Sequence, residues 1–284
     1  MRGRSIGIAA VSSVVLSCAL ISGAGDLTIG PDLEREAGPA PAEASTPAEA
    51  TPGEASAEAA FDDAGASPAC DEPGLEARWT FDEGVGLVVG DCTTHHHDGQ
   101  VLGGRWVDGE RDGGMDFDGG WVGFGNPPGL QLSGPLTACA WIRVASPPPL
   151  AGGGRAYVVD KLFMPSNGGW RLAIGRAGQG GALGATVEIS DPDGGYHETL
   201  GGSIALATWT HICGVFRGTS QSVYVSGLEA ATGATPAGVI TLTSDEVRIG
   251  IRGDGMQPFI GAVDDVRIYS RALDAGEIAA LAQP

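Results

Sequence analysis

The sequence predicts an all-β fold, an antiparallel sandwich or barrel, in the part of the chain that follows about residue 70. Two segments, 136–142 and 209–216, are long enough and rich enough in β-branched and aromatic residues to form core strands. Shorter segments of the same kind occur at 121–124, 156–159, 169–174, 222–225 and 246–249. Glycine-containing turns such as Asp118-Gly119-Gly120 separate them. Many short strands with frequent turns are typical of antiparallel sheets.

The first 25 residues have the layout of an export signal. A short basic start is followed by an uncharged apolar run and then by small residues. Segment 15–18 resembles a bacterial lipoprotein box, in which Cys18 becomes the lipidated first residue. Segment 22–24 instead resembles an ordinary signal-peptidase site, and an uncleaved anchor is the third alternative. All three predict an extracytoplasmic protein, either anchored in the membrane, as a lipoprotein would be, or secreted.

Residues 26–69 differ in composition from the rest of the chain. Ala, Pro and Glu predominate there, and ten acidic residues face the single base Arg35. Proline breaks helices, the charges repel one another, and few apolar groups offset the entropy of ordering. We therefore predict a disordered acidic linker, followed by one domain over residues 70–284. The whole chain has a formal net charge of −19, which argues against a nucleic-acid partner.

Four cysteines remain when Cys18 is set aside, and an even number in an exported domain predicts disulfides. Three pairings are open. We favour Cys139–Cys213, because both residues lie in core-like strands, which leaves Cys70–Cys92. Near the C-terminus, Asp274 and Glu277 have the spacing of a capping box and predict a short helix over 277–281.

Several stretches in order resemble a laminin G-like domain of the concanavalin A-like lectin/glucanase superfamily. The similarity covers about residues 75–282. It rests on Ala77-Arg78-Trp79-Thr80-Phe81-Asp82-Glu83-Gly84, on Gly113-Gly114-Met115-Asp116-Phe117-Asp118-Gly119, and above all on Phe259-Ile260-Gly261-Ala262-Val263-Asp264-Asp265-Val266-Arg267-Ile268-Tyr269-Ser270-Arg271-Ala272-Leu273. The resemblance implies a jelly-roll sandwich of two antiparallel sheets.

The cysteines suggest a further resemblance. Cys139 in its strand and His211-Ile212-Cys213 resemble the disulfide-bonded pair of pentraxins, which implies the same bond here. The residues that follow, Gly214-Val215-Phe216, depart from the pentraxin pattern. The resemblance therefore implies the disulfide and not the ligand specificity of pentraxins.

The resemblance also implies a calcium ion, because domains of this superfamily often hold one. Its candidate ligands are Asp82, a carbonyl near Gly84, and Asp265, which would tie the first strand to the last. Asp118, with Asp116, forms a second candidate. The alternative is that these are solvated acids in turns of an acidic chain.

Two other patterns in the sequence resemble functional motifs but do not predict a metal site or an active site. His95-His96-His97 is interpreted as a polar surface loop rather than a metal site, because consecutive side chains rarely converge on one ion. The segment most like a glucanase motif is 188–193. Its Glu188 and Asp191 fall on opposite faces of a strand and Pro192 interrupts it, so we do not expect an enzyme.

Aromatic side chains are the usual platform for sugars. Tyr196, Trp106 and Trp170 lie near predicted loops or strand ends and are the candidate ligand contacts, although sandwiches bury many tryptophans. The sequence thus predicts a non-catalytic binding module, lectin-like and with a glycan ligand. The alternative is a protein-interaction or adhesion module with a cell-surface protein as partner, and a glycoside hydrolase is the third hypothesis. The sequence does not indicate an oligomeric state.

Overall fold

The computed structural model describes residues 70–163, 168–178, 180–235 and 238–284. The predicted export signal, Cys18 and the acidic linker lie outside these residues. In the described part, no helix is both long enough and apolar enough to cross a membrane.

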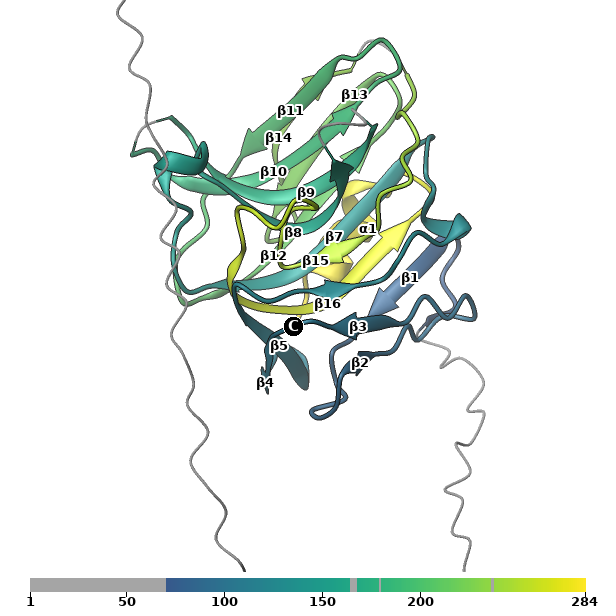
Figure 1. Cartoon of the computed structure of the whole chain (residues 1–284). Coiled ribbons are helices and arrows are strands. Elements are labelled where there is room, and N and C mark those ends of the chain that lie inside the picture. The colour runs from purple at the N-terminus through teal and green to yellow at the C-terminus, as the bar shows by residue number, and fades with distance from the viewer. Residues whose placement is uncertain (1–69, 164–167, 179, 236–237) are drawn as a thin grey trace, which may run out of the picture. The chain divides into compact units, whose positions relative to one another are not determined.

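The described strands form two eight-stranded antiparallel sheets (Figure 1). Sheet A has the order β14 (Leu228–Ala234), β13 (Ser220–Val225), β12 (Trp209–Phe216), β7 (Leu136–Val144), β16 (Ile260–Tyr269), β5 (Gly113–Asp118) and β4 (Arg105–Asp108), with β1 (Leu75–Trp79) paired to β16. Sheet B has the order β11 (Tyr196–Gly201), β10 (Leu183–Ser190), β9 (Gly168–Arg176), β8 (Arg155–Phe163), β15 (Arg248–Ile249), β6 (Val122–Gly123), β3 (Gly99–Val101) and β2 (Val88–Val89).

The main hydrophobic core lies between the two sheets. Alternate residues of each strand point to opposite faces, so one face of each sheet supplies apolar side chains. Trp79, Phe117 and Ile142 come from sheet A, and Trp170 and Leu172 come from sheet B; all five are at most 1% exposed. This arrangement confirms the predicted all-β jelly-roll sandwich of two antiparallel sheets.

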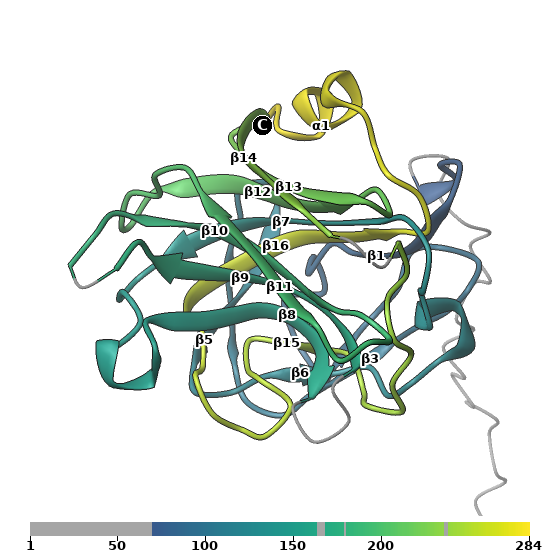
Figure 2. The same cartoon turned by 90° about the horizontal axis from the view of Figure 1, so that it is seen from above.

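One short helix, α1 (Ala275–Leu281), covers the opposite face of sheet A (Figure 2). The side chain of Asp274 accepts a hydrogen bond from the Glu277 amide, and the Glu277 carboxylate accepts one from the Asp274 amide. This is the predicted capping box, although the helix begins two residues earlier than predicted. Ile278 packs into a second apolar cluster with Tyr269 and Leu273.

Both favoured disulfides are present. Cys139 on β7 and Cys213 on β12 are direct cross-strand partners in sheet A, and their side chains are fully buried beneath α1. Cys70 and Cys92 join the start of the domain to the segment between β2 and β3. Disulfides persist in oxidising compartments, so the two bonds indicate an extracellular domain.

Candidate functional site

A row of charged residues crosses sheet B on the face turned away from the core. Asp160 on β8, Arg171 on β9 and Glu188 on β10 are consecutive cross-strand partners, and Glu198 on β11 extends the row. The neighbours of these residues along each strand, Leu172 among them, point into the core. Because side chains alternate along a strand, the sheet brings together charges that lie far apart in the sequence.

Arg171 holds two buried carboxylates at the centre of this row. Its Nε lies 2.9 Å from Asp160 Oδ1 and its terminal nitrogen lies 3.2 Å from Glu188 Oε2. All three side chains are at most 2% exposed, and the amide of Gly253 also donates to Asp160 Oδ2 at 2.6 Å. Burial raises the pKa of Asp160 to about 7 and raises that of Glu188, while Arg171 opposes both changes. Arg171 is thus the cation that the two buried acids share.

The accessible edge of the network consists of Tyr196, Glu198 and Arg155. Tyr196 is 45% exposed, yet its phenol is hydrogen-bonded to Glu188. Arg155 forms an ion pair with Glu198 and lies 3.7 Å from Glu188 Oε1. These bonds fix an exposed tyrosine and an ion pair in one orientation, as a binding site requires.

Gly175 on β9 allows Arg155 to reach across the sheet. It is the cross-strand partner of Arg155, and a Cβ at this position would lie 2.6 Å from an Arg155 terminal nitrogen. Any larger residue would therefore displace the guanidinium from its acidic partners.

A second tyrosine covers the other end of the row. The guanidinium of Arg171 lies 4.6 Å from the centre of the Tyr157 ring, and that of Arg252 lies 5.9 Å from it. Tyr157 is only 3% exposed, and burial raises its pKa. Arg252 is fixed in turn by Asp254 at 2.6 Å. The turn that carries Arg252 therefore closes the network on this side.

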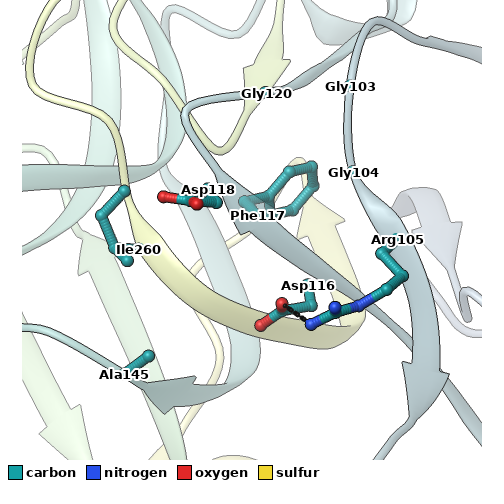
Figure 3. Close-up of a pocket in the computed structure, with 9 residues that line it drawn as sticks. All are labelled: Gly103, Gly104, Arg105, Asp116, Phe117, Asp118, Gly120, Ala145 and Ile260. Carbon is teal, nitrogen blue, oxygen red and sulfur yellow. Dashed lines mark hydrogen bonds and ion pairs between the residues drawn. The ribbon is translucent and has the colours of Figure 1, made fainter.

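The predicted calcium residues lie in three separate places. Asp82 and Gly84 line a pocket of about 460 Å³ with Trp106 and Asp108. Asp118 lines a different pocket of about 450 Å³ (Figure 3). In that second pocket, Asp116 is paired with Arg105 at 2.8 Å.

Asp265 is surrounded by arginines rather than by other acids. Its carboxylate accepts from Arg78 and Arg111 at 2.7 Å each and from Arg267 at 2.9 and 3.1 Å. Burial acts to raise the pKa of Asp265, but the hydrogen bonds and charges of Arg267 and Arg78 outweigh it and hold the pKa below its ordinary value. Both oxygens are occupied by guanidinium groups, so Asp265 does not fit the role of a calcium ligand.

The preceding residue, Asp264, lies in the environment that was predicted for Asp265. Its Oδ2 accepts from the amides of Glu110 and Arg111 at 2.9 and 2.8 Å, while its Oδ1 is buried with no hydrogen-bond partner among the described residues. Asp82 holds the same turn, accepting from the Gly113 amide at 2.8 Å. Burial raises the pKa of Asp264 to about 7, and the charges of Asp265 and Asp82 add to this effect.

The three aromatic residues predicted to contact a sugar differ in their exposure. Trp170 is 1% exposed and belongs to the core, so its ring cannot stack on a sugar. Trp106 packs partly against the core, and its indole nitrogen donates to the Gly86 carbonyl at 3.1 Å. Of the three predicted contacts, Tyr196 is the one exposed residue.

An exposed apolar strip lies beside β2 at the edge of sheet B. It comprises Val85, Leu87, Val88 and Leu102, which are 45–77% exposed. The Val101 amide donates to the Leu87 carbonyl at 2.9 Å, so the two segments that carry these residues run side by side. Exposed apolar residues grouped in this way often mark a contact surface.

Residues 116–279 match the family model of the concanavalin A-like lectin/glucanases superfamily named Laminin_G_3. This match covers more than half of the chain, which therefore belongs to that superfamily. No curated protein matches the chain.

Solved structures share the fold at low sequence identity. The binding domain of Paraclostridial Mosquitocidal Protein 1 is 17% identical with a TM-score of 0.59, covering 74% of this chain and 52% of that one. Domain 4 of a GH43 extracellular arabinanase from Geobacillus stearothermophilus, in complex with arabinotriose, is 20% identical with a TM-score of 0.58, covering 75% and 100%. A Trypanosoma rangeli sialidase is 18% identical with a TM-score of 0.54, covering 76% and 34%. The chain thus spans about half of the mosquitocidal chain and a third of the sialidase.

Proposed function

We propose that the protein is a non-catalytic, extracytoplasmic module that binds a glycan on the outer face of sheet B, at Tyr196, Glu198 and Arg155. The observation that carries the proposal is Tyr196, a residue that is 45% exposed while its phenol is fixed by the buried Glu188. The arabinanase domain solved with arabinotriose supports a sugar as ligand, since it shares this fold over its whole length.

The geometry suits a sugar because it combines an apolar platform with planar hydrogen-bonding groups. An aromatic ring packs against the C–H face of a sugar, while carboxylate and guanidinium groups bond to vicinal hydroxyls. Arg155 and Glu198 are already paired with each other. Binding a ligand therefore costs little conformational entropy for ordering these two side chains. Asp160 and Glu188 both face Arg171, which argues for positioning rather than for acid–base catalysis.

Replacing Tyr196 by alanine is expected to weaken glycan binding about 10-fold or more, because the apolar platform is lost. The measurement is binding of the oxidised chain to a glycan array that includes arabinotriose, followed by titration of the best glycan. Tyr196→Phe keeps the ring but loses the bond to Glu188, so it should lose less affinity than Tyr196→Ala. Leu228→Ala, at an exposed position on β14 in the other sheet, is the control.

Each other outcome points to one alternative. Equal binding by the wild type and Tyr196→Ala would contradict this site. Release of new reducing ends from the bound glycan would favour the glycosidase alternative, with Asp160 and Glu188 as the first residues to replace. No glycan binding by a folded chain would favour the protein-interaction alternative, for which the apolar strip is the surface to test.

We further propose a structural calcium ion held by Asp82 and Asp264, with Asp264 taking the place predicted for Asp265. The unpartnered buried Oδ1 of Asp264 supports a cation here, because a buried carboxylate oxygen without a donor is costly. An ion at this position would fix the turn between β4 and β5 to β1 and β16. It would neutralise the two acids without contacting the glycan site.

Calcium is expected to raise the Tm of the wild-type chain by roughly 5–10 °C over the value in chelator. A site at 100 times its Kd contributes about 2.7 kcal/mol, and each kcal/mol is worth about 2–4 °C in a domain of this size. Asp264→Asn should abolish the shift, whereas Asp118→Asn, in the other pocket, should retain it. A shift that follows Asp118 instead would place the ion in the pocket of Figure 3.

We also propose that the domain is exported and anchored to the membrane by a lipid. The features of residues 1–25 support export, and Cys18 supports a lipid anchor with the acidic segment as a spacer. Release after cleavage near residue 24 is the alternative.

A further inference from the structure

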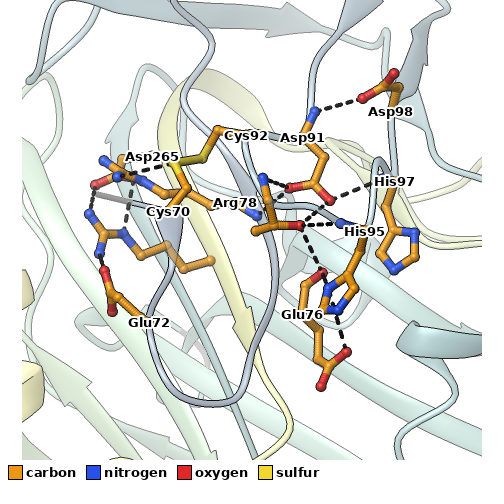
Figure 4. The surroundings of a disulfide bond; sticks show 12 residues. Cys70, Glu72, Glu76, Arg78, Asp91, Cys92, His95, His97, Asp98 and Asp265 are labelled. Carbon is orange, nitrogen blue, oxygen red and sulfur yellow. Dashed lines mark hydrogen bonds and ion pairs between the residues drawn. A yellow bond between two sulfur atoms is a disulfide. The ribbon is translucent and has the colours of Figure 1, made fainter. Parts of the chain in front are cut away.

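The histidine run between β2 and β3 does not present its three side chains equally. His96 has a φ of 51° and is exposed, which places the chain in the left-handed region between its neighbours. The rings of His95 and His97 stack instead, with centroids 5.6 Å apart and an interplanar angle of 21° (Figure 4). Two of the three imidazoles therefore lie together.

A carboxylate from a distant part of the sequence lies beside these two rings. Glu76 belongs to β1; its carbonyl oxygen is hydrogen-bonded to His95 Nδ1 at 2.9 Å, and its Oε2 is 3.8 Å from the same nitrogen, which leaves His95 Nε2 as the ring atom available to an ion. A methyl group built on Gly129 would lie 2.7 Å from His97 Nε2 and 3.4 Å from Glu76 Oε2. Both atoms thus border the same small volume above Gly129. His97 Nε2 is buried and has no hydrogen-bond partner among the described residues.

The loop that carries the histidines is held firmly. The carboxylate of Asp91 accepts hydrogen bonds from the amides of Thr93 and His97 at 3.0 Å each. The indole of Trp79 donates to the His97 carbonyl at 2.8 Å, and Cys92 is tied to Cys70 by a disulfide. Ligands fixed in this way need little reorganisation to bind an ion.

We propose that His95, His97 and Glu76 form a binding site for one divalent transition-metal ion, Zn²⁺ by preference. Two imidazoles and one carboxylate, with water as the fourth ligand, are an established donor set for zinc. The stacked rings must turn to point their nitrogens at one ion, and the 43% exposed side chain of His95 has room to do so. The ion would tie β1 to the loop between β2 and β3, independently of the glycan site.

The electrostatic surroundings suit a cation. The carboxylates of Asp91, Glu76 and Asp98 all lie close enough to act on His97, so negative charge surrounds the proposed ion. The other two histidines outside the run are occupied elsewhere: His197 lies 2.7 Å from Asp191, and His211 is 2% exposed beside the Cys139–Cys213 disulfide. His96 is therefore the main competitor for an added ion.

The test is calorimetric titration of the tag-free, oxidised chain with Zn²⁺ at pH 7. We expect one ion per chain with a Kd in the micromolar range or below. His95→Gln and His97→Gln should each weaken binding about 30-fold or more, and Glu76→Gln about 10-fold. His96→Asn, in which Asn tolerates the left-handed backbone, is the matched control and should leave the affinity unchanged. Circular dichroism shows that each variant is folded.

A second readout separates a built site from a flexible histidine run. Co²⁺ in place of Zn²⁺ should give the intense visible bands of a four-coordinate ion, and these should disappear in His97→Gln. Binding that His96→Asn weakens as much as His95→Gln would overturn the proposal, since any exposed histidine run would behave so. Unchanged affinity in His97→Gln would overturn it as well.

Discussion

Replacing Arg171 by methionine is expected to lower the free energy of unfolding by about 3–5 kcal/mol at pH 7. Methionine has a similar length but no charge, so Asp160 and Glu188 would remain buried without their shared partner. Both carboxylates are at most 1% exposed and cannot turn to water without breaking the sheet face. Urea unfolding followed by circular dichroism measures the loss.

The loss in the free energy of unfolding caused by Arg171→Met should become smaller as the pH falls from 7 to 5. The pKa of Asp160, about 7, and that of Glu188 are already raised, and removing Arg171 raises both further. A carboxyl whose pKa is higher in the folded state costs stability above its unfolded pKa, and this cost fades as the pH falls toward that value. The acids then fold as neutral groups.

Arg105→Met is the matched control for this prediction. Arg105 is also paired with an aspartate, Asp116 at 2.8 Å, but its side chain is 77% exposed. Its loss should cost at most about 1 kcal/mol. A cost below 1 kcal/mol for Arg171→Met at pH 7, or one that increases on acidification, would show that the buried row is not held by this guanidinium.

The sequence predicted the fold well because its signals are local. The apolar run at 136–142 became β7, and the Asp274 capping box became the start of α1. The disulfide pairing followed from strand assignments, since two cysteines in core strands of one sandwich can be neighbours. Trp170 shows where local signals fail: it lies next to a predicted turn, yet the register of β9 turns it into the core.

The candidate site could not be predicted to the same degree, because it depends on how the strands are aligned with one another and on irregularities within single strands. Asp264 and Asp265 read alike in the sequence, but β16 is irregular between Asp264 and Arg267, and Asp265 has a φ of 42°. This irregularity directs one carboxylate to the turn at Glu110 and the other to three arginines. The row through Arg171 likewise exists only when β8, β9 and β10 are aligned.

Replacing both Cys139 and Cys213 by alanine is expected to cost about 4 kcal/mol in the free energy of unfolding. The bond spans 74 residues, so its loss releases a large part of the unfolded chain from a constraint. Both cysteines are fully buried against Tyr269 and Ile278, and the smaller alanines leave unfilled space there. Guanidinium unfolding of the double variant, compared with the wild type, measures the cost.

The Cys70–Cys92 pair gives the matched comparison, because it spans only 22 residues and predicts a smaller loss of about 3 kcal/mol. If its removal costs more than that of Cys139–Cys213, loop entropy is not the dominant contribution. The difference would then come from the ion pairs beside the first disulfide, in which Arg267 joins Glu72 to Asp265. Arg267→Met in the background without Cys70 and Cys92 would then cost much less than the same change in the wild type, because the two losses would share one cause.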